Sequence, residues 1–161
     1  GEIFLNDASL MTMMAYSAGF VAFSTIILLV FYVLKSIGLM TMAANKNIEN
    51  AWLAWIPVVD LYIAGSIVEE MNLFGKRLDN LGLRLPLIMV FGFFLGLIPF
   101  IGMLFNLAIM LFFLLFVYNL FNLYSPRQAT LYTILSLFGL LPIFLFIVRN
   151  QQPIPNKNLQ I

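Results

Sequence analysis

A run of 25 residues without a charged side chain, residues 10–34, constrains this chain more than any other feature. As an α-helix it rises about 37 Å, which exceeds the roughly 30 Å hydrocarbon core of a bilayer. Asp7 or Ser9 can cap its first turn, and Lys35 follows it. The run predicts a membrane-spanning helix with room to continue past Lys35 towards Ala44. The acidic start differs from a secretory signal peptide, so we expect this helix to be retained.

The composition excludes a soluble globule and several kinds of chemistry. Hydrophobic residues make up 63% of the chain and charged residues 9%, against about 45–50% and about 25% in soluble domains. The net charge of +1 gives no basis for nucleic-acid binding. Cysteine and histidine are both absent, which removes disulfides, the usual transition-metal ligands and the usual nucleophile and general base. We therefore expect no catalytic residue, metal or cofactor.

A second apolar segment, residues 51–70, carries a proline and a carboxylate near its middle. Pro57 interrupts any continuous helix but suits the first turn of a new one. Asp60 would lie in that same turn, where the helix dipole favours a carboxylate. We predict a short piece over 51–56, a bend, and a helix from Pro57 to about Glu70. The aromatic side chains of this segment prefer the headgroup boundary: Trp52, Trp55 and Tyr62.

Three more spans are predicted after a mixed-charge loop, 71–83, that turns at Gly75. They cover residues 85–98, 103–123 and 129–148. The first of them is too short to cross the hydrocarbon core unless Leu83 and a snorkelling Arg84 extend it. A tight turn is expected at 99–102 and a kink at 139–142. The expected fold is an all-α integral membrane protein, with four transmembrane helices and a bent re-entrant or interfacial element at 51–70. One helical membrane domain would occupy 1–150, and 151–161 would form an extended polar tail.

Two faces of small side chains predict close helix packing. One is Ala15, Ala18, Gly19 and Ala22, and the other is the pair Gly92 and Gly96. We expect them to pack against each other within the chain, the alternative being contact with a separate protein. Three asparagines are expected to hydrogen-bond between helices, the alternative being a polar path through the bilayer: Asn106, Asn119 and Asn122.

Charge counting favours a segment 51–70 that does not cross the bilayer. In that case six basic residues share one side against Arg149 and Lys157, whereas a crossing segment divides them four to four. The positive-inside rule then places both termini outside and the 35–84 region in the cytoplasm.

Two groups of carboxylates are candidate sites. Asp60 is either a functional group that contacts an ion, proton or lipid headgroup, or a dipole-stabilised residue facing water at a helix start, which we favour. Glu69 and Glu70 are adjacent and do not face each other on a helix, so we expect a solvated helix end.

The segment from Ala51 to Gly65, AWLAWIPVVDLYIAG, resembles one found in small uncharacterised multi-spanning membrane proteins of Gram-positive bacteria. The order of parts over about residues 20–150 is also similar, including the closing PIFLFIVRN. The resemblance implies a bacterial plasma membrane and no particular activity. Where this chain has Asp60, those proteins often have another polar residue, which argues against an obligatory proton-carrying role.

These features favour a non-enzymatic accessory or scaffold subunit of a membrane assembly, in contact with lipid and with other membrane chains in a homo- or hetero-oligomer. The alternative is a small transporter, channel-like or lipid-handling protein that uses Asp60 at the Pro57 bend. An enzyme acting on lipid headgroups is a third hypothesis.

Overall fold

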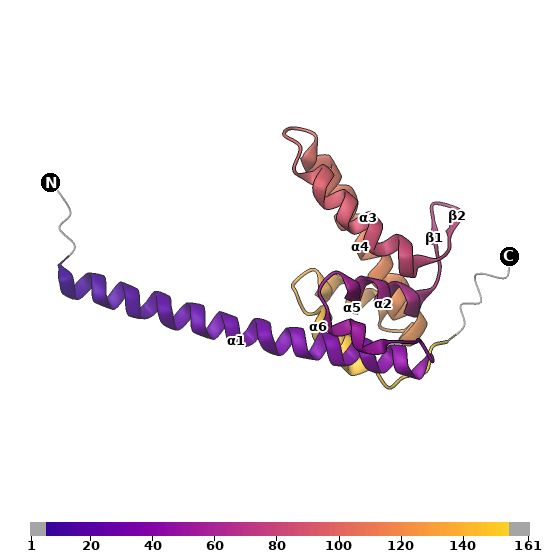
Figure 1. Cartoon of the computed structure of the whole chain (residues 1–161), viewed down its shortest axis with the longest axis horizontal. Helices are drawn as coiled ribbons and strands as arrows, with labels where there is room; N and C mark the ends of the chain where they lie inside the picture. The colour runs from indigo at the N-terminus through magenta and orange to yellow at the C-terminus, as the bar shows by residue number, and fades with distance from the viewer. Residues whose placement is uncertain (1–5, 155–161) are drawn as a thin grey trace.

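The computed structural model describes residues 6–154, and its most prominent element is helix α1, Asp7–Asn45. Figure 1 shows that α1 projects far from a body formed by the rest of the chain. Its 39 residues rise about 58 Å. Side chains before Lys35 are almost all exposed, and burial begins at Ser36. The expected continuation past Lys35 is therefore confirmed, and α1 contacts the body from about Tyr32 onward.

The bent element predicted at 51–70 consists of a 3-10 helix, η1 (Ala51–Trp55), and helix α2 (Val59–Val68). Asn47 and Asn50 adopt positive φ between α1 and η1, a conformation that asparagine tolerates better than most residues. Pro57 lies two residues before α2 rather than in its first turn, whereas Asp60 does lie in that turn.

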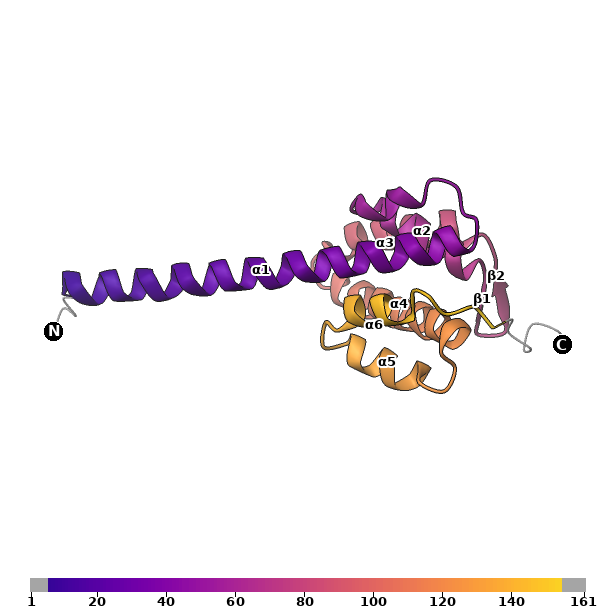
Figure 2. The same cartoon turned by 90° about the horizontal axis from the view of Figure 1, so that it is seen from below.

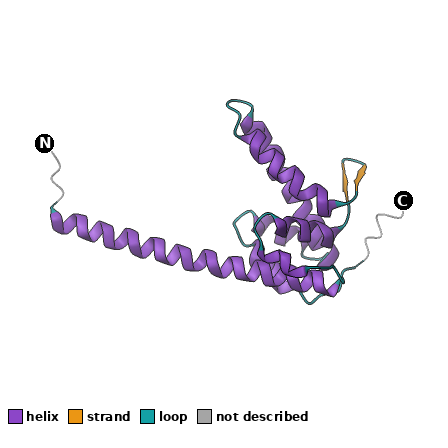
Figure 3. Cartoon of the chain, viewed as in Figure 1, coloured by secondary structure: helices purple, strands orange, loops and turns teal. Residues whose placement is uncertain are grey.

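A small β hairpin forms within residues 71–83, which were predicted to be a loop. Strands β1 (Met71–Leu73) and β2 (Lys76–Leu78) pair antiparallel and are orange in Figure 3. Phe74 and Gly75 connect them, both with positive φ, as the tightest two-residue hairpin turn requires. The turn expected at Gly75 is present, and the hairpin is the one departure from an all-helical fold among the described residues.

Helices α3 (Leu81–Gly96) and α4 (Gly102–Tyr124) form an antiparallel hairpin that leaves the body at an angle to α1 (Figure 1). The turn predicted at 99–102 joins them, and its Phe100 is almost fully exposed. α3 begins at Leu81, so it includes Arg84, and Pro86 lies inside it. Its 16 residues rise only about 24 Å.

The fourth span predicted at 129–148 does not form. The segment contains two short helices, α5 (Ala129–Ser136) and α6 (Leu141–Val148), which run back alongside each other (Figure 2). Gly139 has a φ of +81° in the connection, and Pro142, in the first turn of α6, cannot donate a backbone hydrogen bond to the preceding turn. The two residues expected to kink one helix instead end one helix and begin another.

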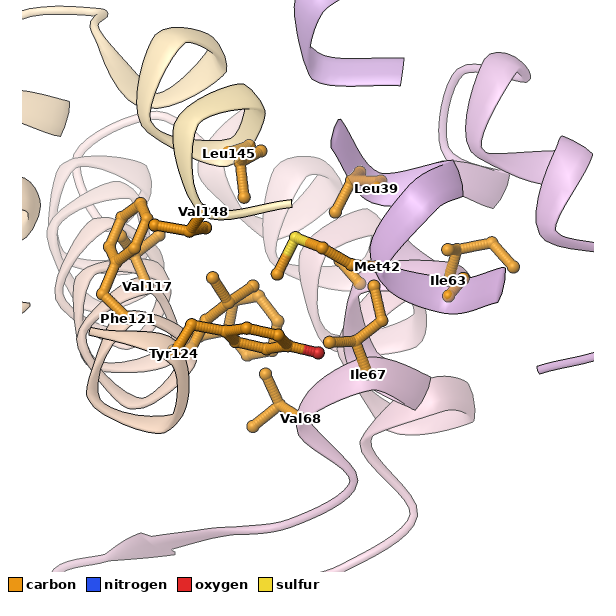
Figure 4. Packing of buried hydrophobic residues seen from close by; sticks show 14 of the residues in the cluster. Leu39, Met42, Ile63, Ile67, Val68, Val117, Phe121, Tyr124, Leu145 and Val148 are labelled. Atoms are coloured by element: carbon orange, nitrogen blue, oxygen red, sulfur yellow. The ribbon is translucent and has the colours of Figure 1, made fainter. Parts of the chain in front are cut away.

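The core lies where the end of α1 meets α2, α4 and α6. Figure 4 shows side chains from all four helices converging, and several have no exposed surface, among them Met42, Ile67, Phe121 and Val148. Glycines allow two of these contacts to be close. A Cβ built on Gly38 would lie 2.8 Å from the carbonyl carbon of Leu145, and one built on Gly65 would collide with the backbone of Leu81.

The end of the last helix lies beside the end of the first. The Asn45 side-chain amide donates to the Arg149 carbonyl at 3.2 Å, and the Ile154 amide donates to the Leu123 carbonyl at 2.6 Å. The chain after α6 is thus tied to the end of the body that is farthest from the start of α1 (Figure 1). The expected arrangement with both termini outside assumed a single span at 129–148, whereas α5 and α6 form two short helices there; the sidedness of the termini stays a prediction. Residues 155–161 of the expected tail lie outside the described part.

Candidate functional site

The bend between η1 and α2 brings the candidate polar site against α1. Ile56 is extended, as the residue before a proline prefers, and Val58 has a φ of +71°. Because a β-branched residue rarely adopts positive φ, the bend is strained and depends on its surroundings. The Asp60 amide donates to the Ile56 carbonyl at 2.9 Å, which closes the turn.

Asp60 forms an ion pair with Lys35 of α1. Both side chains are largely buried, with exposed fractions of 14% for Asp60 and 22% for Lys35. The Lys35 Nζ also lies 4.8 Å from the centre of the Tyr32 ring, close enough for a cation–π interaction. Asp60 is therefore neither an unpaired carboxylate in lipid nor a water-facing one. It lies at a helix start, where the dipole favours a carboxylate, and the Lys35 ammonium supplies its counter-charge.

Lys35 and Tyr32 belong to this site, although the sequence alone did not indicate either of them. The Tyr32 hydroxyl donates to the Trp55 carbonyl, and the two rings meet edge to face with centroids 6.2 Å apart. In the sequence, Lys35 stands out only as the first charge after the apolar run 10–34. The available signal was a pair of opposite charges beside apolar sequence: Lys35 directly after the apolar run 10–34, and Asp60 in the middle of the apolar part of 51–70.

The aromatic residues of the site have different surroundings. Trp55 packs against α1, Trp52 is 58% exposed, and Tyr62 is partly exposed. Behind the ion pair, a cavity of about 110 Å³ is lined mostly by apolar side chains of α1, α2, α4 and α6. The Lys35–Asp60 pair forms the polar side of this cavity, and the other lining residues are apolar.

Charged residues at the other end of α2 are paired across elements. Lys46 contacts Glu69 at 2.9 Å and the Ile67 carbonyl at 2.7 Å. Glu70 pairs with Arg77 of the β hairpin, and Arg84 with Asp79 at 3.0 Å. These carboxylates line a pocket of about 370 Å³ between α2 and α3. Because Glu69 and Glu70 pair with different cations, they do not act as a carboxylate pair.

The expected contact between the two small-residue faces does not form. Gly92 and Gly96 face α4, where added Cβ atoms would collide with Ile109 and Asn106. Gly19 has nothing within 4 Å of an added Cβ. The other members of its face, Ala15, Ala18 and Ala22, are exposed. The α1 face is left uncovered because α1 diverges from the α3–α4 hairpin (Figure 1).

The three asparagines of α4 differ in their roles. The Asn106 side chain donates to the Gly96 carbonyl of α3 at 3.4 Å, a contact between helices. Asn119 instead donates to the Leu115 carbonyl of its own helix at 2.8 Å. Asn122 is partly buried in the last turn of α4. The expected contact between helices is present for Asn106, whereas Asn119 bonds within its own helix.

Taken together, the described residues form a helical protein with two helices, α1 and α4, that are long and apolar enough to cross a membrane by length and composition. No family model, curated protein or solved structure matches the chain.

Proposed function

We propose that this chain is a non-enzymatic accessory or scaffold subunit of the bacterial plasma membrane, which binds another membrane chain through the uncovered face of α1. One observation carries the proposal: the most apolar 18-residue window of α1 is 0% buried by its own chain. The stripe Ala15, Ala18, Gly19 and Ala22 lies on the exposed part of α1. Small side chains let a second helix approach closely in lipid, where dispersion and backbone contacts drive association.

The charge distribution supports an extracytoplasmic start for α1. No basic residue lies between Asp7 and Leu34, whereas Lys35 and all later basic residues follow that stretch. Basic residues accumulate on the cytoplasmic side of membrane proteins. The end of the body that carries the ion pairs of Lys46, Arg77 and Arg84 would then face the cytoplasm.

Substituting Gly19 with isoleucine tests this proposal. In mild detergent we expect the wild-type chain to run as a complex above its 18.3 kDa monomer mass, and Gly19→Ile to shift most of it to the monomer by preventing close helix approach. Ser24→Ile, on the opposite side of α1, is the matched control and should leave the complex intact. Native mass spectrometry measures both. A wild-type chain that is monomeric in membrane-derived samples would overturn the proposal.

A small transporter or lipid-handling protein remains the alternative function, and the observation that favours it is the cavity beside the Lys35–Asp60 pair. Under that hypothesis, flux across reconstituted vesicles should disappear in Asp60→Ala and persist in the surface control Glu49→Gln. The existing ion pair favours a structural role instead, because Asp60 already has a partner.

A further inference from the structure

We propose that the α5–α6 hairpin inserts into the acyl chains of the cytoplasmic leaflet without crossing it, so that the chain after α6 lies on the side opposite to the start of α1. This inference rests on the membrane residence in the proposed function, but not on any protein partner. Eight residues in each helix give a depth of about 12 Å. A hydrocarbon core of roughly 30 Å leaves about 15 Å for one leaflet.

The tip of this hairpin has the chemistry of a lipid-facing surface. The four residues between the helices are Leu137, Phe138, Gly139 and Leu140, and Phe138 is 76% exposed. A loop that emerges into water on the far side ordinarily carries polar or charged residues, which this tip lacks. The apolar exposure continues down α5 through Leu131 and Ile134.

Backbone groups at the tip are largely satisfied within the hairpin, as immersion in lipid requires. The amides of Leu137, Phe138 and Gly139 donate to carbonyls of α5 at 3.0 to 3.1 Å. The hydroxyls of Thr133 and Ser136 donate to carbonyls one turn back, at 2.7 and 2.6 Å. The hairpin therefore reaches its tip without presenting these donors to lipid.

The opposite end of the body is where the basic residues gather. The α1–η1 connection, the β hairpin, the α4–α5 connection and the end of α6 all lie at the end of the body away from the start of α1 (Figure 2). Together with the first turn of α3, these segments carry six basic residues: Lys46, Lys76, Arg77, Arg84, Arg127 and Arg149.

The four-span topology placed Arg149 on the outer side of the membrane, whereas the α5–α6 hairpin places it on the cytoplasmic side. The Arg149 carbonyl accepts the hydrogen bond from Asn45 at the end of α1, so it shares a side with Lys46. Among the described residues, every basic side chain then lies on the body and none on α1 before Lys35. The positive-inside rule assigns that side to the cytoplasm.

Single-cysteine labelling tests the inference cleanly, because the natural chain has no cysteine. The three variants are Asn6→Cys, Phe138→Cys and Gln151→Cys in the full chain in bacterial membranes. A membrane-impermeant maleimide should label Asn6→Cys in intact cells and Gln151→Cys only in inverted vesicles. Phe138→Cys should be labelled from neither side. Labelling of Gln151→Cys from the outside would show that the hairpin crosses, and would overturn the inference.

A spin label on Phe138→Cys in lipid nanodiscs identifies what covers the tip. Greater collision with oxygen than with a water-soluble nickel complex supports acyl chains. Dipolar broadening between labels would show that a second copy covers the tip, and the inference would fail. Release of the wild-type chain from membranes by alkaline carbonate would instead refute membrane residence, so that failure of the proposed function is distinguished from failure of this inference.

Discussion

Replacing Asp60 with asparagine is expected to lower the free energy of unfolding by about 3–5 kcal/mol, since the largely buried Lys35 ammonium then lacks its counter-charge. Replacing both partners with apolar residues, Lys35→Met with Asp60→Leu, should recover most of the loss, because neither charge then needs compensation. Unfolding in a detergent titration can be followed by the fluorescence of Trp52 and Trp55, the two tryptophans of the chain. Both lie on η1.

The exposed ion pair between Arg84 and Asp79 provides the control. Its side chains are about half and two-thirds exposed, so Arg84→Gln should cost less than about 1 kcal/mol. If Asp60→Asn proved equally mild, the Lys35–Asp60 pair would not hold the bend against α1. The double variant also separates the two functional hypotheses, since a stable protein without Asp60 can be tested for flux.

Substituting Gly65 with alanine should destabilise the body by about 1–3 kcal/mol through overpacking. The added Cβ would collide with the Leu81 carbonyl, which is backbone and cannot turn aside as a flexible side chain can. The β hairpin joins α2 to α3 through short connections, which opposes a compensating shift of α2 away from α3. The same detergent titration measures the change.

Gly19→Ala is the matched control for Gly65→Ala, because it adds the same methyl group at an exposed position. Nothing lies within 4 Å of the added Cβ, and alanine favours a helix over glycine by up to about 1 kcal/mol. Unfolding of the body should therefore be unchanged. Equal destabilisation by both substitutions would contradict the close approach of α2 and α3.

The sequence predicted those elements whose formation is governed locally. α1, α4 and the turn between α3 and α4 follow from long apolar runs and from Pro99 and Gly102. The bend before α2 follows from Pro57, and Asp60 lies in the first turn of that helix as expected.

The remaining features depend on contacts between distant segments. The apolar pattern at 129–148 suits one kinked helix as well as two short ones, and the contact of α6 with α1 around Gly38 and Asn45 accompanies the second arrangement. The Lys35–Asp60 pair likewise joins positions 25 residues apart. The β hairpin lacks an Asn-Gly or Asp-Gly turn signal, because Phe74 occupies the first turn position.

The contact of the first helix with the last has a consequence for biosynthesis. Asn45 and Arg149 are separated by 104 positions, and translation proceeds at about 5–20 residues per second. The buried side of α1 around Leu39 and Met42 must therefore wait roughly 5–20 s for α6 to be made. A nascent chain arrested before Leu141 would therefore lack the contacts that α6 makes with α1 around Gly38 and Asn45.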